Sequence, residues 1–262
     1  MSIKAIIYCS DNINDQATEH DERHKEFWDN LSCLRAADQE RDTLFLSDKD
    51  KRIQSHEDNS IFLLAVDRGA NDLYRHQIIP DLIIGDMDSI NPEVHDHFRE
   101  LTRIILYPEK KEATDTELAL DWCSDNDFRD ILIVNDLQGE FAHSLGVVML
   151  LFKARERGIR AAIFTMRELV FLIPQIYQSN GAASCRRWSC RGRPRRRISL
   201  IPLSDSVKHI STSGLEYPLD KDELFRYATR GLSNVFVDGE IEICYEFGEL
   251  LGVMESSFEE IL

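Results

Sequence analysis

The chain has 262 residues, a formal net charge of −16 and six cysteines. This length allows one large or two modest domains whose cores need no disulfide or metal for stability. The negative charge argues against general binding of nucleic acids or of anionic membranes. No apolar run reaches membrane-spanning length, and the amino terminus does not resemble a signal peptide. Because the cysteines lack zinc-ligand spacing, we expect reduced thiols in a cytoplasmic protein.

The first part of the chain alternates short apolar runs with helical patterns. The expected strands are residues 5–9, 61–66, 83–84, 103–107 and 131–134, and the expected helices are residues 72–77, 92–102, 116–123 and 144–157. Polar loops follow the strands. This order predicts a parallel sheet with crossover helices, and ligands bind such sheets at the carboxyl ends of the strands.

From about residue 168 helical patterns nearly vanish and short strands dominate. The expected strands are residues 170–173, 198–203, 207–210, 241–245 and 250–254. The predicted fold class is therefore α/β, with a parallel-sheet domain over residues 1–165 followed by a small all-β domain, sandwich-like or jelly-roll-like, over residues 166–262.

The segment Ile83-Ile84-Gly85-Asp86-Met87-Asp88-Ser89 places two carboxylates where a strand gives way to a loop. Two carboxylates about 4 Å apart repel by roughly 4 kcal/mol at an effective dielectric of 20. A divalent cation converts this repulsion into attraction, and Mg²⁺ favours a few carboxylate oxygens together with waters and phosphates. The alternative is an Asp-rich turn capped by Ser89, which is common in α/β proteins.

A second polar segment, Thr114-Asp115-Thr116-Glu117, has the spacing of a capping box and precedes apolar helical positions. A helix start offers free N–H groups and the positive end of the helix dipole, which suit phosphate. Lys111 lies just upstream and adds a cation. Taken alone this is an ordinary helix cap with a solvated lysine. Beside the Asp86 and Asp88 pair it predicts a site for metal-bound polyphosphate.

The same motifs occur in one order in a known family. Its patterns Asp-Gly-Gly-Ala-Asn, Gly-Asp-x-Asp-Ser and Lys-Asp-x-Thr-Asp correspond here to Asp67-Arg68-Gly69-Ala70-Asn71, Gly85-Asp86-Met87-Asp88-Ser89 and Lys111-Glu112-Ala113-Thr114-Asp115. On these residues the chain resembles thiamin pyrophosphokinase, which transfers a diphosphate from ATP to the thiamin hydroxyl and releases AMP. Residues 198–203, 214–219 and 231–234 extend the resemblance over most of residues 61–250.

The resemblance implies roles for individual residues. Mg²⁺ would be held by the catalytic residues Asp86, Asp88 and Asp115, with Asp67 as a weaker candidate. ATP would meet Asp67, Asn71, Lys111, Thr114, Gly139 and His143, although Asn71 could instead shape its loop and His143 could be structural. Thiamin would meet Ser233 and Asn234 in the second domain. The resemblance also implies a homodimer, with thiamin held near the contact between the chains.

Departures from the family pattern keep a second function open. The Gly-Gly-Arg-x-Asp-His segment is here Gln138-Gly139-Glu140-Phe141-Ala142-His143, so a carboxylate replaces a phosphate-facing cation and an alanine replaces an aspartate. Arg68 stands where a glycine is usual and adds one positive charge. The second function is a catalytically weak or inactive nucleotide-binding homologue.

Two segments lie outside this scheme. Residues 11–60 form a charged insertion with an amphipathic pattern around Phe27, Trp28, Leu31 and Leu34, which we expect to be a surface helix beside an acidic loop. Residues 185–197 are rich in arginine and must be exposed, either as a loop between strands or as a flexible strip that binds RNA or another polyanion. The third function is accordingly a polyanion-binding adaptor that uses the strip Arg186–Arg197.

Overall fold

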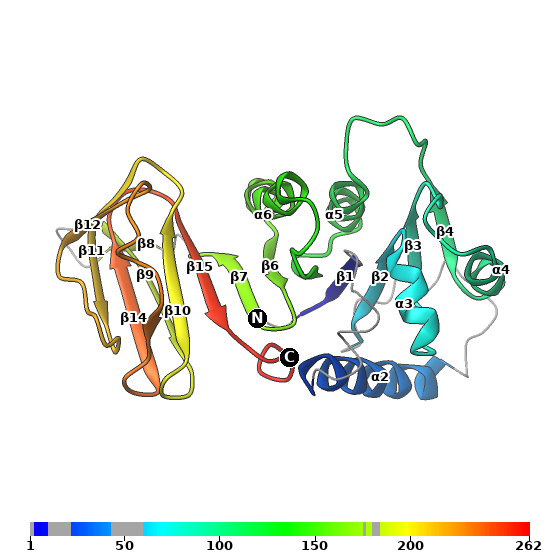
Figure 1. Ribbon diagram of the computed structural model, residues 1–262, viewed down its shortest axis with the longest axis horizontal. Coiled ribbons are helices and arrows are strands. Elements are labelled where there is room, and N and C mark those ends of the chain that lie inside the picture. The colour runs from blue at the N-terminus through cyan, green and yellow to red at the C-terminus, as the bar shows by residue number, and fades with distance from the viewer. Residues whose placement is uncertain (1–2, 10–21, 43–59, 175–176, 180–183) are drawn as a thin grey trace. The chain divides into compact units, whose positions relative to one another are not determined.

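The computed structural model describes residues 3–9, 22–42, 60–174, 177–179 and 184–262, which form two compact units (Figure 1). The first unit contains Met1–Arg167 and Ser257–Leu262, and the second contains Glu168–Ser256. The division lies two residues from the predicted boundary. The carboxyl-terminal segment, which we expected in the all-β domain, belongs to the first unit. Phe258 explains this, because its 1 % exposed ring packs 4.8 Å from Phe27 and 5.8 Å from Phe164 between ring centroids.

A parallel sheet forms the centre of the first unit, in the order β6-β5-β1-β2-β3-β4. Its strands are β1 Ala5–Cys9, β2 Phe62–Val66, β3 Leu82–Gly85, β4 Arg103–Leu106, β5 Asp130–Val134 and β6 Arg160–Phe164. The three central strands β1, β2 and β5 are almost wholly buried, as expected for a sheet covered on both faces. The order changes direction at β1, so the carboxyl ends of β1 and β5 form the switch point at which such sheets bind ligands.

Helices cover both faces of this sheet (Figure 1). They are α2 Glu22–Asp42, α3 Gly69–Arg75, α4 Pro92–Leu101, α5 Asp115–Asp125 and α6 Phe141–Glu156. The alternation of side chains along the strands assigns α2 and α5 to opposite faces. Tyr8 of β1 points toward Phe27 of α2, whereas Phe62, which pairs with Ala5 and so points to the other face, stacks on Trp122 of α5. The result is a three-layer α/β/α unit.

Helix α2 is part of the core rather than the surface helix that we expected. Phe27 and Leu31 are at most 1 % exposed. Arg35, 7 % exposed, donates two hydrogen bonds of 2.9 Å to Asp81, and Asp81 also accepts the N–H of Leu63 at 2.8 Å. The remainder of the insertion, residues 11–21 and 43–59, lies outside the described residues. Among the described helices, none combines the length and apolar composition needed to cross a bilayer.

The second unit is a sandwich of two antiparallel sheets, in the orders β13-β10-β15-β7 and β12-β11-β14-β9-β8. Its strands are β7 Glu168–Leu172, β8 Tyr177–Ser179, β9 Ser184–Arg191, β10 Arg197–Pro202, β11 Ser206–Ser213, β12 Asp222–Phe225, β13 Asn234–Val235, β14 Glu240–Tyr245 and β15 Leu250–Glu255. Trp188 and Phe171 pack between the two sheets at a centroid distance of 5.2 Å. The predicted fold class, a parallel α/β domain followed by an all-β domain, is confirmed.

Only part of the arginine-rich segment is the exposed loop that we expected. Most of it is strand β9, which pairs with the acidic strand β14. Arg187 forms an ion pair of 3.0 Å with Glu242, and Arg191 lies 3.9 Å from Glu240. Arg196, beyond the strand, is only 4 % exposed. The prediction of an exposed loop holds for most of residues 192–196, which connect β9 to β10. It was wrong for residues 185–191, because it considered the segment alone, whereas the opposing strand β14 supplies carboxylates to Arg187 and Arg191.

Candidate active site at the carboxyl edge of the parallel sheet

Asp67 begins the site at the end of strand β2. Its backbone N–H donates to the carbonyl of Ile84 in β3 at 2.9 Å, and its φ of 43° turns the chain into the short helix α3. Gly85 permits this approach, because a Cβ added there would lie 3.0 Å from the Cβ of Asp67. A left-handed residue in contact with a neighbouring strand is the kind of constrained geometry that concentrates at functional sites.

Three carboxylates meet at this point. Asp67, Asp86 and Asp88 each offer one oxygen, and these oxygens lie within 4.8 Å of one another. Asp67 Oδ2 accepts a short hydrogen bond from the hydroxyl of Ser89, while Asp67 Oδ1 is buried and has no hydrogen-bond partner. A buried carboxylate oxygen without a donor is an uncommon feature that calls for an explanation. An all-oxygen donor set with such an unpartnered atom fits a hard divalent cation such as Mg²⁺.

The carboxylates perturb one another. Burial, together with the nearby charges of Asp86 and Asp115, raises the pKa of the Asp67 carboxyl despite the hydrogen bond from Ser89. The charge of Asp86 raises the pKa of Asp88. The hydrogen bond from Lys111 instead lowers the pKa of Asp86. The trio therefore concentrates negative charge that a bound cation would relieve.

Lys111 and Asp115 extend the site from the loop before α5. Lys111 Nζ lies 3.0 Å from Asp86 Oδ2 and 3.0 Å from Asp115 Oδ1, and its side chain is 13 % exposed. Burial opposes the lysine charge, but the two carboxylates outweigh it and raise the pKa of Lys111. Asp115 therefore contacts Lys111 rather than the three converging oxygens. Asp67, which the sequence suggested only as a weaker metal ligand, provides one of those three oxygens.

The predicted helix cap is present at α5. The Thr114 hydroxyl accepts the N–H of Glu117 at 3.2 Å. One residue beyond Asp115, the hydroxyl of Thr116 lies 3.4 Å from the thiol of Cys9 at the end of β1. The start of α5 is therefore fixed beside the switch point of the sheet.

Asn71 shapes the loop, which was one of the two roles considered for it. Only 5 % of the residue is exposed. Its amide donates to the carbonyl of Ser89 and accepts the N–H of Asn91, both at 3.0 Å. The loop that carries Asp86, Asp88 and Ser89 is in this way held to helix α3. Ser89, which we interpreted from the sequence only as a turn cap, donates a hydrogen bond to Asp67. Its position in the Gly-Asp-x-Asp-Ser motif is the sequence feature that could have indicated this role.

Comparison with known proteins assigns these residues to a family. A family model described as thiamin pyrophosphokinase, catalytic domain, matches residues 53–163, and one described as thiamin pyrophosphokinase, vitamin B1 binding domain, matches residues 191–248. The chain belongs to the thiamin pyrophosphokinase family. The main functional prediction is thereby confirmed at the level of the family, and none of the comparisons supports the weak homologue or the polyanion-binding adaptor.

Individual thiamin pyrophosphokinases are distant relatives. The chain is 24 % identical over 200 residues to thiamine pyrophosphokinase of Bacillus subtilis (strain 168), covering 76 % of this chain and 89 % of that one. It is 25 % identical over 179 residues to thiamine pyrophosphokinase 1 of Oryza sativa subsp. japonica, covering 66 % and 65 %.

Solved structures of the family share the fold. The B. subtilis enzyme superposes with a TM-score of 0.69 at 19 % identity, covering 97 % of this chain and 99 % of that chain. The yeast thiamin pyrophosphokinase superposes with a TM-score of 0.68 at 13 % identity, covering 99 % and 89 %.

The segment that departs from the thiamin pyrophosphokinase pattern runs from the loop after β5 into the first turn of α6. Gly139 is in the connecting loop, Glu140 is the N-cap of α6 without a side-chain capping bond, and His143 is half-buried in the first turn. Asn135, to which sequence reasoning gave no role, is fully buried at the end of β5. Its side-chain oxygen accepts the N–H of Leu137 at 2.9 Å, and its Nδ2 has no partner. No spacing in the sequence marks it.

The two residues predicted to meet thiamin lie in the second unit. Asn234, at the start of β13 and 9 % exposed, bonds both backbone groups of Tyr217, at 3.1 Å to the N–H and 2.8 Å to the carbonyl. Its amide is thus used to hold a neighbouring loop. Ser233 has an exposed side chain, and its backbone N–H donates to the hydroxyl of Ser199 at 3.0 Å.

Proposed function

We propose that this chain transfers a diphosphate group from ATP to the hydroxyl of thiamin, giving thiamin diphosphate and AMP. The observation that carries the proposal is the convergence of Asp67, Asp86 and Asp88 at the carboxyl edge of the sheet, in a chain that both family models match. Family membership is also the support for proposing ATP as co-substrate, a homodimer and a cytoplasmic location.

The described residues fit a magnesium-bound triphosphate. Asp67, Asp86 and Asp88 would hold Mg²⁺, and Asp115 would act through water or through Lys111. The metal, when bound, supplies neutralisation of the charge on the phosphate groups. Lys111, now shared by two carboxylates, lies where a polyphosphate could compete for it. Thr114, Gly139 and His143, at the starts of α5 and α6, are the remaining proposed phosphate contacts.

Diphosphate transfer depends on positioning and on charge neutralisation more than on covalent help from the protein. The thiamin hydroxyl oxygen loses its proton to solvent and forms a bond to the β-phosphorus of ATP. The bond from that phosphorus to the oxygen bridging the α-phosphate breaks, and AMP leaves with that oxygen. For the acceptor side we propose Ser233, whose hydroxyl is exposed, and Asn234, which fixes the Tyr217 loop beside it.

The test is AMP release in the presence of thiamin, ATP and Mg²⁺. The wild-type chain should release AMP only when all three are present. Asp88→Asn should abolish turnover while the fold stays intact, and Asp96→Asn, an exposed aspartate on α4, is the matched control that should retain it. Absence of thiamin-dependent AMP release by the wild-type chain would refute the activity. Full turnover by Asp88→Asn would refute the metal assignment alone.

A further inference from the structure

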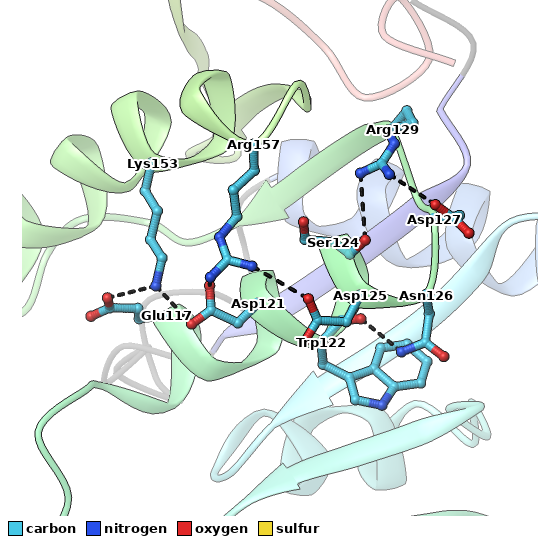
Figure 2. A network of polar contacts seen from close by, with 10 residues as sticks. All are labelled: Glu117, Asp121, Trp122, Ser124, Asp125, Asn126, Asp127, Arg129, Lys153 and Arg157. Atoms are coloured by element: carbon cyan, nitrogen blue, oxygen red, sulfur yellow. Dashed lines mark hydrogen bonds and ion pairs between the residues drawn. The ribbon is translucent and has the colours of Figure 1, made fainter.

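An ion-pair ladder joins helices α5 and α6 (Figure 2). Lys153 of α6 lies 2.8 Å from Glu117 and 2.7 Å from Asp121 of α5. One helical turn later, Arg157 lies 3.0 Å from the same Asp121 and 3.4 Å from Asp125. The two cations therefore share one carboxylate, but they contact opposite ends of α5.

Lys153 contacts the end of α5 that enters the site. Glu117 is in the first helical turn, where its N–H bonds the hydroxyl of Thr114, and it lies two residues beyond Asp115, which pairs with Lys111. Glu117 and Asp121 are four residues apart, so without a cation between them their like charges destabilise this turn. Burial opposes the charge of Lys153, but the hydrogen bonds that it donates to both carboxylates outweigh burial and raise its pKa, so the cation is present at neutral pH.

We propose that Lys153 is a positioning residue that fixes the first turn of α5 for catalysis. It acts through Glu117, which holds the capped start of α5 so that Asp115 and Lys111 meet Asp86. Arg157 stabilises the same pair of helices farther from the site and has no such role. This inference rests on the proposed function, because it is the nucleotide site that Lys153 orders.

The first arm of the test measures binding and turnover. Lys153→Met should weaken binding of a non-hydrolysable ATP analogue with Mg²⁺, measured by calorimetry, and lower kcat, each by about 1.5-fold to fivefold, which is the range expected for a partly exposed ion pair. Lys153→Arg should restore both values. Arg157→Met, which also removes a cation from Asp121, should leave both values unchanged. In a Glu117→Gln background, Lys153→Met should have little further effect, because the interaction is already absent.

The second arm does not depend on activity. The N–H of Leu118, which donates to the carbonyl of Thr114 at 3.0 Å, should exchange its hydrogen faster in Lys153→Met than in Arg157→Met. Equal exchange in the two variants, or equal effects of both on analogue binding, would overturn the inference. If the wild-type chain neither binds the analogue nor turns over, the proposed function fails instead, and the exchange experiment still decides whether Lys153 orders this turn.

Discussion

Replacing Asp67 by asparagine should make the metal-free protein more stable. Its carboxylate lies within 4.8 Å of the ligand oxygens of Asp86 and Asp88. At that distance two unit charges repel by about 3.5 kcal/mol at an effective dielectric of 20. Lys111 already compensates Asp86 and solvent screens the site, so about 1 kcal/mol is the expected net gain. An asparagine can still accept the hydroxyl hydrogen bond of Ser89.

The raised pKa of Asp67 also indicates that its ionised carboxylate destabilises the folded state. A carboxyl that ionises at higher pH in the folded than in the unfolded state lowers stability as pH rises through the interval between the two pKa values. Above that interval the full cost is present. The gain from Asp67→Asn should therefore be largest at neutral pH and should disappear in acid, where the wild-type carboxyl is protonated.

Thermal unfolding in EDTA and in Mg²⁺ measures both effects. For the wild-type chain, Mg²⁺ at 100 times its Kd should stabilise the folded state by about 2.7 kcal/mol, which corresponds to a Tm increase of about 5–10 °C for a chain of this size. Asp67→Asn should raise Tm by about 2–4 °C in EDTA and lose most of the Mg²⁺ response. Ser89→Ala keeps all three carboxylates and should keep the response. A variant that is less stable in EDTA and responds to Mg²⁺ like the wild-type chain would refute the reasoning.

Three further changes test other parts of the structure. Asp81→Ala leaves the buried charge of Arg35 without its carboxylate and should lower the free energy of unfolding in urea by about 3–5 kcal/mol. Arg35→Met combined with Asp81→Leu should lower it clearly less. Glu140→Arg with Ala142→Asp should raise kcat/KM about tenfold, because the arginine restores a charge-assisted phosphate contact and the aspartate restores the family pattern beside it; an unchanged value would mean that other groups supply that contact. Phe258→Ala should destabilise the first unit by about 3–5 kcal/mol, and a loss below 1 kcal/mol would show that the carboxyl-terminal segment is not part of its core.

Most of the first unit is predictable because the local sequence of its strands indicates where they begin and end. Runs such as Ile131–Val134 are apolar throughout, and polar residues begin where each strand ends. Strand β6, Arg160–Phe164, was missed because its run is short and follows a helix closely. The place of Phe258 could not be predicted, since nothing near it in sequence indicates which aromatic side chains it will meet.

In the second unit, the partners of several polar side chains could not be predicted from the sequence of one strand. Arg187 and Arg191 of strand β9 meet their carboxylate partners across the sheet, on β14. This pairing depends on hydrogen bonds between strands that are far apart in sequence, so local composition does not predict it. The same limit applies to Asn234, whose amide is satisfied by Tyr217, seventeen residues away.

The metal ligands illustrate the limit at the site itself. Motif spacing identifies the loops that meet, because strands β2 and β3 are neighbours and α5 begins at the same edge. It does not identify which oxygens stay available for a cation. In the structure Lys111 pairs with Asp115 Oδ1, whereas an oxygen of Asp67 lies within 4.8 Å of oxygens of Asp86 and Asp88. Because these three oxygens converge while the Asp115 oxygen is already paired with a lysine, Asp67 is a stronger candidate for a direct ligand than Asp115, the reverse of the order that the motifs suggest.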